Sequence, residues 1–140
     1  MLSAAAVLVC AFGLLGRPAS SFPPIVLLDT RPADITGTAE AFVRHDPDTI
    51  YLLTTTVAFR KAQAGNKDAL KKLASILVHE EWHIRNGPDE RRAYQAQMGA
   101  LYLLGVEPGR PLVLEVRRSM RAVLAARKRA AQQPGIAAVP

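Results

Sequence analysis

The sequence predicts a small α+β domain in which a short N-terminal β-sheet precedes three helices. Short apolar and β-branched runs separated by turn residues occupy the chain between residues 22 and 57, and from Lys67 onward apolar residues recur at helical spacing. Strands first and helices after are typical of α+β proteins. The chain has 140 residues, of which 49% are hydrophobic, so one folded domain is expected.

Three strands are predicted before the helices. The first lies in residues 23–31, where a β-branched run follows two prolines. The second and third lie in residues 39–44 and 49–57, and the turn sequence "HDPD" separates them. Residues 58–64 are expected to continue into a helical turn.

The helical part of the chain divides into three segments. The apolar residues of the first recur at spacings of three and four: Leu70, Leu73, Ala74 and Leu77. Asn86 and Gly87 form a stop signal for this helix. A second helix is predicted over about residues 89–104, and a third, which is strongly basic, over about residues 112–132.

The first 21 residues differ in character from the rest. Residues 2–16 carry no charge and are too few to span a membrane, which takes about 20 apolar residues. They have the length of a signal-peptide core, and small residues follow them, so we expect cleavage after about Ser21 and export to the periplasm or the extracellular space. The alternatives are a buried N-terminal helix and a retained anchor. The domain would then span residues 22–132, with residues 133–140 as a flexible tail.

Cysteine usage limits the kinds of site that the chain can form. Cys10 is the only cysteine, and it lies inside the uncharged run. Removal of that run would leave no thiol, hence no disulfide. A metal site in the remaining chain must therefore use histidine and carboxylate ligands.

The sequence "HEEWH" places His79 and His83 four residues apart on the first predicted helix, with Glu80 directly after His79. Residues i and i+4 share a helix face, so both imidazoles can point at one ion, and zinc accepts neutral imidazole nitrogen readily. Glu80 lies at the edge of this face, where it can accept a proton from a zinc-bound water as general base. The simpler alternative is a polar patch on an ordinary helix, with Glu80 and Glu81 facing solvent.

A catalytic zinc site needs a third protein ligand, and Asp89 and Glu90 are the candidates. Acidic residues are also favoured in the first turn of any helix by the macrodipole. Helical phase distinguishes the two, because Asp89 is rotated from Glu90 by about 100°. One stripe of the second helix has an apolar far end that must face the core: Glu90, Ala93, Tyr94, Gln97, Leu101 and Leu104. The periodicity therefore favours Glu90.

The motif "HEEWH" followed by "ERRAY" resembles the gluzincin branch of the zincin metallopeptidases, here in a minimal single-domain form. The resemblance implies Zn²⁺ as cofactor, with His79, His83 and Glu90 as ligands on an active-site helix and a ligand helix. It also implies Glu80 as the general base, a peptide or protein as the substrate, and a strand at residues 50–55 that forms the sheet edge for peptide pairing. Counting as in the metzincins instead places Asp89 at the third-ligand position, so this alternative stays open.

The charge pattern supports a second function. The net charge is +6, and residues 110–129 carry seven basic side chains against a single acidic one, Glu115. The runner-up function is a non-catalytic exported binding module on a zincin scaffold, whose basic C-terminal helix contacts an anionic membrane or a protein partner. Nucleic-acid binding is not expected, because aromatic residues do not interleave with the basic ones.

Overall fold

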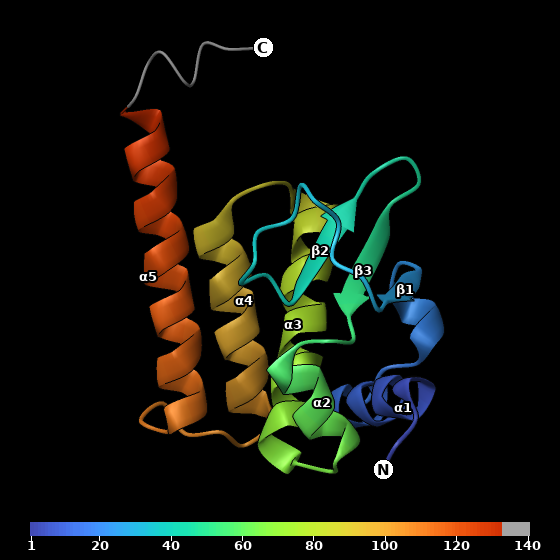
Figure 1. The fold of residues 1–140 in the computed structure, drawn as a ribbon. Coiled ribbons are helices and arrows are strands. Elements are labelled where there is room, and N and C mark those ends of the chain that lie inside the picture. Colours follow the sequence, from blue (N-terminus) through green and yellow to red (C-terminus); the bar gives the residue numbers. More distant parts are fainter. Residues whose placement is uncertain (133–140) are drawn as a thin grey trace.

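The computed structural model describes residues 1–132, which form an α+β domain as predicted (Figure 1). In chain order its elements are α1 (Ala4–Leu15), a 3-10 turn (Ala19–Ser21), β1 (Ile25–Leu28), β2 (Ala41–Arg44), β3 (Thr49–Leu53), α2 (Val57–Gln63), α3 (Lys67–Asn86), α4 (Glu90–Leu103) and α5 (Pro111–Ala131). The predicted strands and helices therefore occur in the predicted order. The expected flexible tail, residues 133–140, lies outside the described residues.

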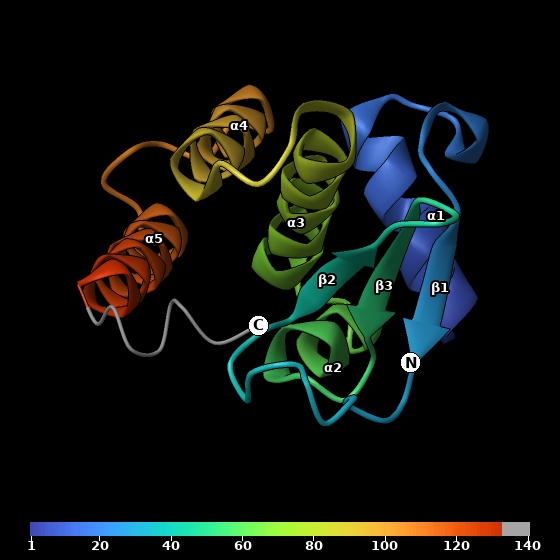
Figure 2. The same cartoon turned by 90° about the horizontal axis from the view of Figure 1, so that it is seen from above.

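The three strands form one sheet in the order β1-β3-β2. β1 pairs parallel to β3, and β2 pairs antiparallel to β3. The expectation that residues 50–55 form a sheet edge is therefore wrong, because β3 is the central strand. β1 pairs with β3 on the side away from β2, with Ile25 opposite Ile50. β2 is therefore the edge strand that lies on the side of α5 (Figure 2).

Helix α3 organises the core. It contacts α1, α2 and the sheet on one side and α4 on the other, and α5 lies beyond against α4 (Figure 2). Leu73 and Leu77 of α3 are fully buried together with Ile50, Leu52 and Phe59. Its polar residues point in different directions: His79 and His83 face α4, whereas Glu81 faces the segment after α1.

The uncharged N-terminal run is helix α1 in this structure, and it packs on α3. Val7 and Ala11 are buried in the core. Among residues 1–132, no helix combines the length and apolar character needed to cross a bilayer. Export remains a prediction, and the N-terminal residue of the purified protein tests it. A start near Phe22 would indicate a cleaved leader, whereas an intact Met1 would indicate that the packed helix is retained.

The segment after α1 is tied to α3 by an ion pair. Arg17 Nη1 and Nη2 donate to the two carboxylate oxygens of Glu81 at 2.7 and 2.6 Å, and Arg85 adds a third contact at 3.2 Å. Burial by itself raises the pKa of Glu81, but the hydrogen bonds and charges of the two arginines lower it below its usual value. Glu80 and Glu81 are each only 8% exposed, so the alternative in which both face solvent is wrong.

We predict that Arg17→Ala destabilises the full-length protein, because it leaves the buried Glu81 carboxylate with Arg85 alone. Leaving a buried polar group without its partner costs about 1–3 kcal/mol. The loss in the free energy of unfolding should lie near the lower end of this range, because the Arg17 guanidinium is one-third exposed. Urea denaturation measures the loss. The control is Arg44→Ala, which removes an exposed ion pair with Asp34 and should have a smaller effect. Equal effects of the two substitutions would contradict the prediction.

Candidate metal centre

Two histidines of α3 and the first residue of α4 meet at one point. Glu90 Oε1 lies 3.2 Å from His79 Nε2 and is in direct contact with His83 Nε2. One ligand atom from each of the three side chains lies within 4.8 Å of the other two. The three residues are buried or half-buried, so the group lies inside the protein rather than on an open surface. This geometry suits a single metal ion.

The turn between α3 and α4 brings the carboxylate to the histidines. Gly87 ends α3 with φ of 107° and ψ of −164°, a conformation that only glycine adopts readily. The chain then reverses, and the exposed Asp89 caps α4 by accepting a hydrogen bond from the Arg92 backbone N–H at 3.2 Å. Glu90, one residue later, points inward. The structure thus brings Glu90 to His79 and His83, and it leaves Asp89 at the surface.

Both imidazoles are oriented by hydrogen bonds at their other nitrogen. His83 Nδ1 lies 2.9 Å from the Gly87 carbonyl oxygen, and His79 Nδ1 lies 2.9 Å from Gln97 Oε1. The Gln97 amide in turn donates to Ser75 Oγ at 3.3 Å, which fixes its orientation. Since both partners are acceptors, each ring donates a hydrogen bond from Nδ1 and turns Nε2 toward Glu90.

The roles of these orienting groups could not be predicted from the sequence. For Gln97, the only indication in the sequence is its position on the inward stripe of α4. Ser75 lies one turn before His79 on α3 and is fully buried. The role of Gly87 as an acceptor could not be predicted, because the acceptor is a backbone carbonyl oxygen, which every residue has.

The convergent atoms need a cation between them. In the metal-free protein, protons on the two Nε2 atoms make the hydrogen bonds to Glu90. Without these protons the two imidazole lone pairs and the ionised carboxylate repel one another unless a metal cation takes their place. Two histidine nitrogens and one carboxylate oxygen, with at least one position open, are a ligand set that catalytic zinc sites use. The donor atoms therefore fit Zn²⁺, and the hydrogen bonds at both Nδ1 atoms are those that metal-bound histidines normally have.

The two carboxylates of the centre have opposite electrostatic environments. Burial raises the pKa of Glu80, which is 8% exposed and has no hydrogen bond or ion pair with any described residue. Burial also acts to raise the pKa of Glu90, but its hydrogen bonds with His79 and His83 hold it well below its usual range. For His83, burial acts to lower the pKa, and the hydrogen bonds to Glu90 and Gly87 raise it overall. Glu90 is thus a permanent anion, and Glu80 is a carboxylate that accepts a proton more readily.

Two further side chains of the centre come from α4 and α5. The Tyr94 ring meets the His79 ring edge-on, with the ring centroids 4.5 Å apart. Burial and the nearby carboxylates raise the pKa of Tyr94 to about 12, so its phenol stays protonated. Arg127 Nη2 lies 3.9 Å from the second oxygen of Glu90, on the outer side of the site.

A cavity of about 790 Å³ opens beside the centre, and His79, Glu80 and Glu90 form part of its wall. Helices α3 and α4 form its floor, while α5 lies on one side and the loop leading into edge strand β2 on the other (Figure 2). The wall from α5 combines small and apolar side chains with two arginines: Val116, Arg118, Ser119, Ala122, Val123, Ala126 and Arg127. Both the carboxylate of Glu80 and the edge of the sheet therefore border one space.

Comparison of the chain with known protein families, with curated proteins and with solved structures finds no match. The resemblance to zincins thus rests on the motif residues of the sequence alone.

We predict that zinc affinity depends on Glu90 and on the orienting amide of Gln97. In calorimetric titration of chelator-treated protein, Glu90→Gln should weaken zinc binding sharply, and Gln97→Leu by about 10–100-fold. Asp89→Asn is the matched control and should leave the affinity unchanged, because that carboxylate caps α4. An equal loss in Asp89→Asn would move the ligand to that residue, and failure of the wild type to bind zinc would overturn the site.

Proposed function

We propose that the protein is a zinc-dependent metallopeptidase. The observation that carries this proposal is the convergence of His79 Nε2, His83 Nε2 and Glu90 Oε1 beside Glu80, a carboxylate without a partner among the described residues. Structural zinc sites are usually closed by four protein ligands, whereas a site with three protein ligands keeps a position for water or substrate. The cavity beside the cluster supplies the space for that substrate.

Each residue of the centre has a role in this proposal. His79, His83 and Glu90 hold the zinc ion, which when bound would lower the pKa of a water molecule and polarise the scissile carbonyl. Glu80 takes the proton from the attacking water and passes it to the leaving amine nitrogen, a task that its raised pKa favours. Tyr94 remains protonated next to His79 and can donate a hydrogen bond to the oxyanion that develops on the carbonyl.

The substrate of this proposal is a peptide or an unfolded protein segment. The free edge of β2 lies at the cavity, and its residues Ala41 and Phe42 are part of the cavity wall. An extended peptide can pair with a sheet edge through main-chain hydrogen bonds. The edge that serves this purpose is thus β2 rather than residues 50–55.

We predict that Glu80→Gln abolishes hydrolysis and retains zinc. The amide is nearly the same size as the carboxylate and cannot accept the proton, so the rate should fall by at least about 10²–10⁴-fold. The assay is peptide-library cleavage followed by mass spectrometry, with zinc content measured on the same samples. Asp89→Asn serves as the control, since it changes a nearby carboxylate that points to solvent. Full activity of Glu80→Gln would show that Glu80 is not the base.

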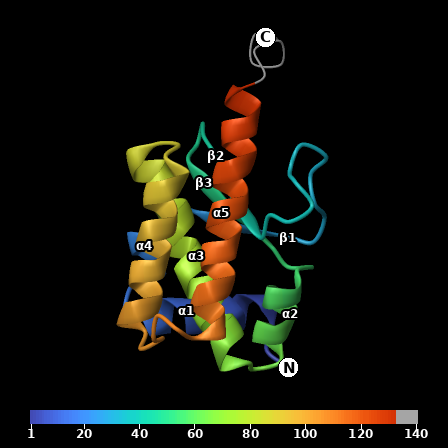
Figure 3. The same cartoon turned by 90° about the vertical axis from the view of Figure 1, so that its left-hand side faces the viewer.

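The second candidate function is a binding module without catalysis, and the exposed part of α5 favours it. Six basic residues of this helix are exposed: Arg117, Arg118, Arg121, Arg127, Lys128 and Arg129. The C-terminal end of α5 projects past the other elements (Figures 1 and 3), so an anionic membrane or a protein partner can reach it. A wild type that binds zinc and cosediments with anionic vesicles, yet cleaves no library peptide, would favour this function.

A further inference from the structure

A second cavity, of about 620 Å³, continues the first along α5. Pro111, Leu112 and Glu115 of α5 line the second cavity, whereas residues from Val116 to Arg127 line the first. The two cavities share three lining residues: Thr38, Glu40 and Lys72. Together they form one groove beside α5, and these shared residues mark the boundary between its two parts.

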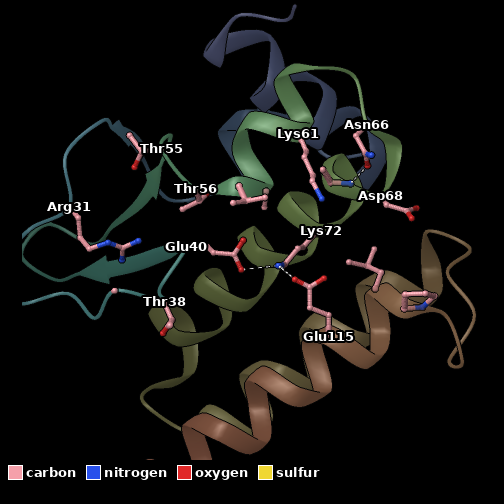
Figure 4. A pocket seen from close by; sticks show the side chains of 16 residues that line it. Arg31, Thr38, Glu40, Thr55, Thr56, Lys61, Asn66, Asp68, Lys72 and Glu115 are labelled. Atoms are coloured by element: carbon pink, nitrogen blue, oxygen red, sulfur yellow. Dashed lines mark hydrogen bonds and ion pairs between the residues drawn. The ribbon is translucent and has the colours of Figure 1, made fainter.

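An ion-paired bridge crosses the groove at that boundary (Figure 4). Lys72 Nζ, on α3, lies 3.0 Å from Glu40 Oε1 and 2.7 Å from Glu115 Oε1. Glu40 comes from the loop before β2, and Glu115 comes from α5. The bridge thus joins the floor of the groove to both of its sides. We call Glu40, Lys72 and Glu115 the groove bridge.

The groove bridge is partly shielded from solvent. The side chain of Lys72 is 13% exposed, and that of Glu40 is 25% exposed. Burial acts to lower the pKa of Lys72, but the two carboxylates raise it overall, so the ammonium stays charged. A chain that passed through the bridge would have to separate this ammonium from two carboxylates and leave the charges without partners, which is costly in a shielded position.

The position of the bridge sets a length. Lys72 precedes Glu80 by eight residues on the same helix, and at 1.5 Å per residue this is about 12 Å. An extended peptide advances by about 3.3 Å per residue. From the base to the bridge there is therefore room for about three residues of substrate.

We infer that the groove bridge is the end wall of the substrate cleft and limits the peptide on that side of the scissile bond to about three residues. This inference rests on the proposed peptidase function. It makes Lys72, Glu40 and Glu115 specificity-determining residues, and it makes the enzyme one that cuts near one end of its substrate. The second cavity, behind the wall, does not receive the substrate chain.

The test measures binding separately from hydrolysis. A nested series of fluorescent peptides is lengthened one residue at a time at either end and titrated into the zinc-loaded Glu80→Gln protein, with anisotropy as the readout. On one side the affinity should rise for about three residues and then stop rising. In the active protein, mass spectrometry of the products should show a short fragment of matching length.

Two variants open the wall. Lys72→Ala removes the centre of the bridge, and Glu115→Ala removes its more exposed arm while Lys72 keeps Glu40. In either variant the length at which affinity stops rising should increase, and longer end fragments should appear. Asp68→Asn is the matched control, because Asp68 lines the second cavity outside the bridge. It should leave both lengths unchanged.

The outcomes separate this inference from the proposed function. Affinity that rises without limit on both sides, or an unchanged limit in both Lys72→Ala and Glu115→Ala, would overturn the end wall and leave the peptidase in place. Absence of both binding and cleavage across the series would overturn the peptidase, and the end wall with it. A change in folding stability alone, with the limit unmoved, would show that the groove bridge is only a structural tie.

Discussion

The approach of His79 Nε2, His83 Nε2 and Glu90 Oε1 to one point is the constraint that the turn between α3 and α4 must satisfy. Direct attraction among these atoms depends on protons that a metal would displace, so the surrounding structure must hold the three side chains in place. It does so through the Gly87 turn, the Asp89 cap and the hydrogen bonds to both Nδ1 atoms. Each of these features fixes the direction of a side chain or of the backbone, and none of them buries much apolar surface. Such rigid positioning is what a metal site requires of its second layer of contacts.

Helix α3 contains four buried polar or charged residues, and most of their hydrogen-bond partners come from other elements. Ser75, His79, Glu80 and Glu81 are all less than 9% exposed. Partners for three of them come from distant parts of the chain: Gln97 of α4 contacts Ser75 and His79, and Arg17, after α1, binds Glu81. Glu80 alone among the four has no partner in residues 1–132. No buried side-chain oxygen or nitrogen of the described residues lacks a partner, so the carboxylate oxygens of Glu80 are open to the cavity that this residue lines.

Local sequence patterns were sufficient for the three strands, for the helices from Lys67 onward and for the inward direction of Glu90, but not for the packing of α1 in the core. Helical phase depends only on residues a few positions apart, so the orientation of Glu90 and Asp89 could be derived without the fold. Strand order could not, because whether β1 pairs with β3 or β2 depends on the path of residues 29–40 and not on any strand's own composition. The same limit explains why Glu81 was misplaced: its partner Arg17 lies 64 residues away. The groove bridge likewise joins residues of three separate segments.

The two ends of α5 are held with different strength, which bears on how the cleft can open. Its first turns pack Leu112, Val113 and Val116 into an apolar cluster with Leu101, and Glu115 binds Lys72. Beyond Val116 the polar contacts of α5 are weak, as in the 3.4 Å hydrogen bond from Arg127 to the Pro88 carbonyl. Segments with few buried contacts open locally at a lower free energy than well-packed ones. Of the groove's walls, the distal part of α5 is therefore the one whose displacement needs the least free energy. In the proposed peptidase, the cleft would therefore be closed firmly at the groove bridge and loosely near Glu90, and a peptide would enter near Glu90 and extend toward Lys72.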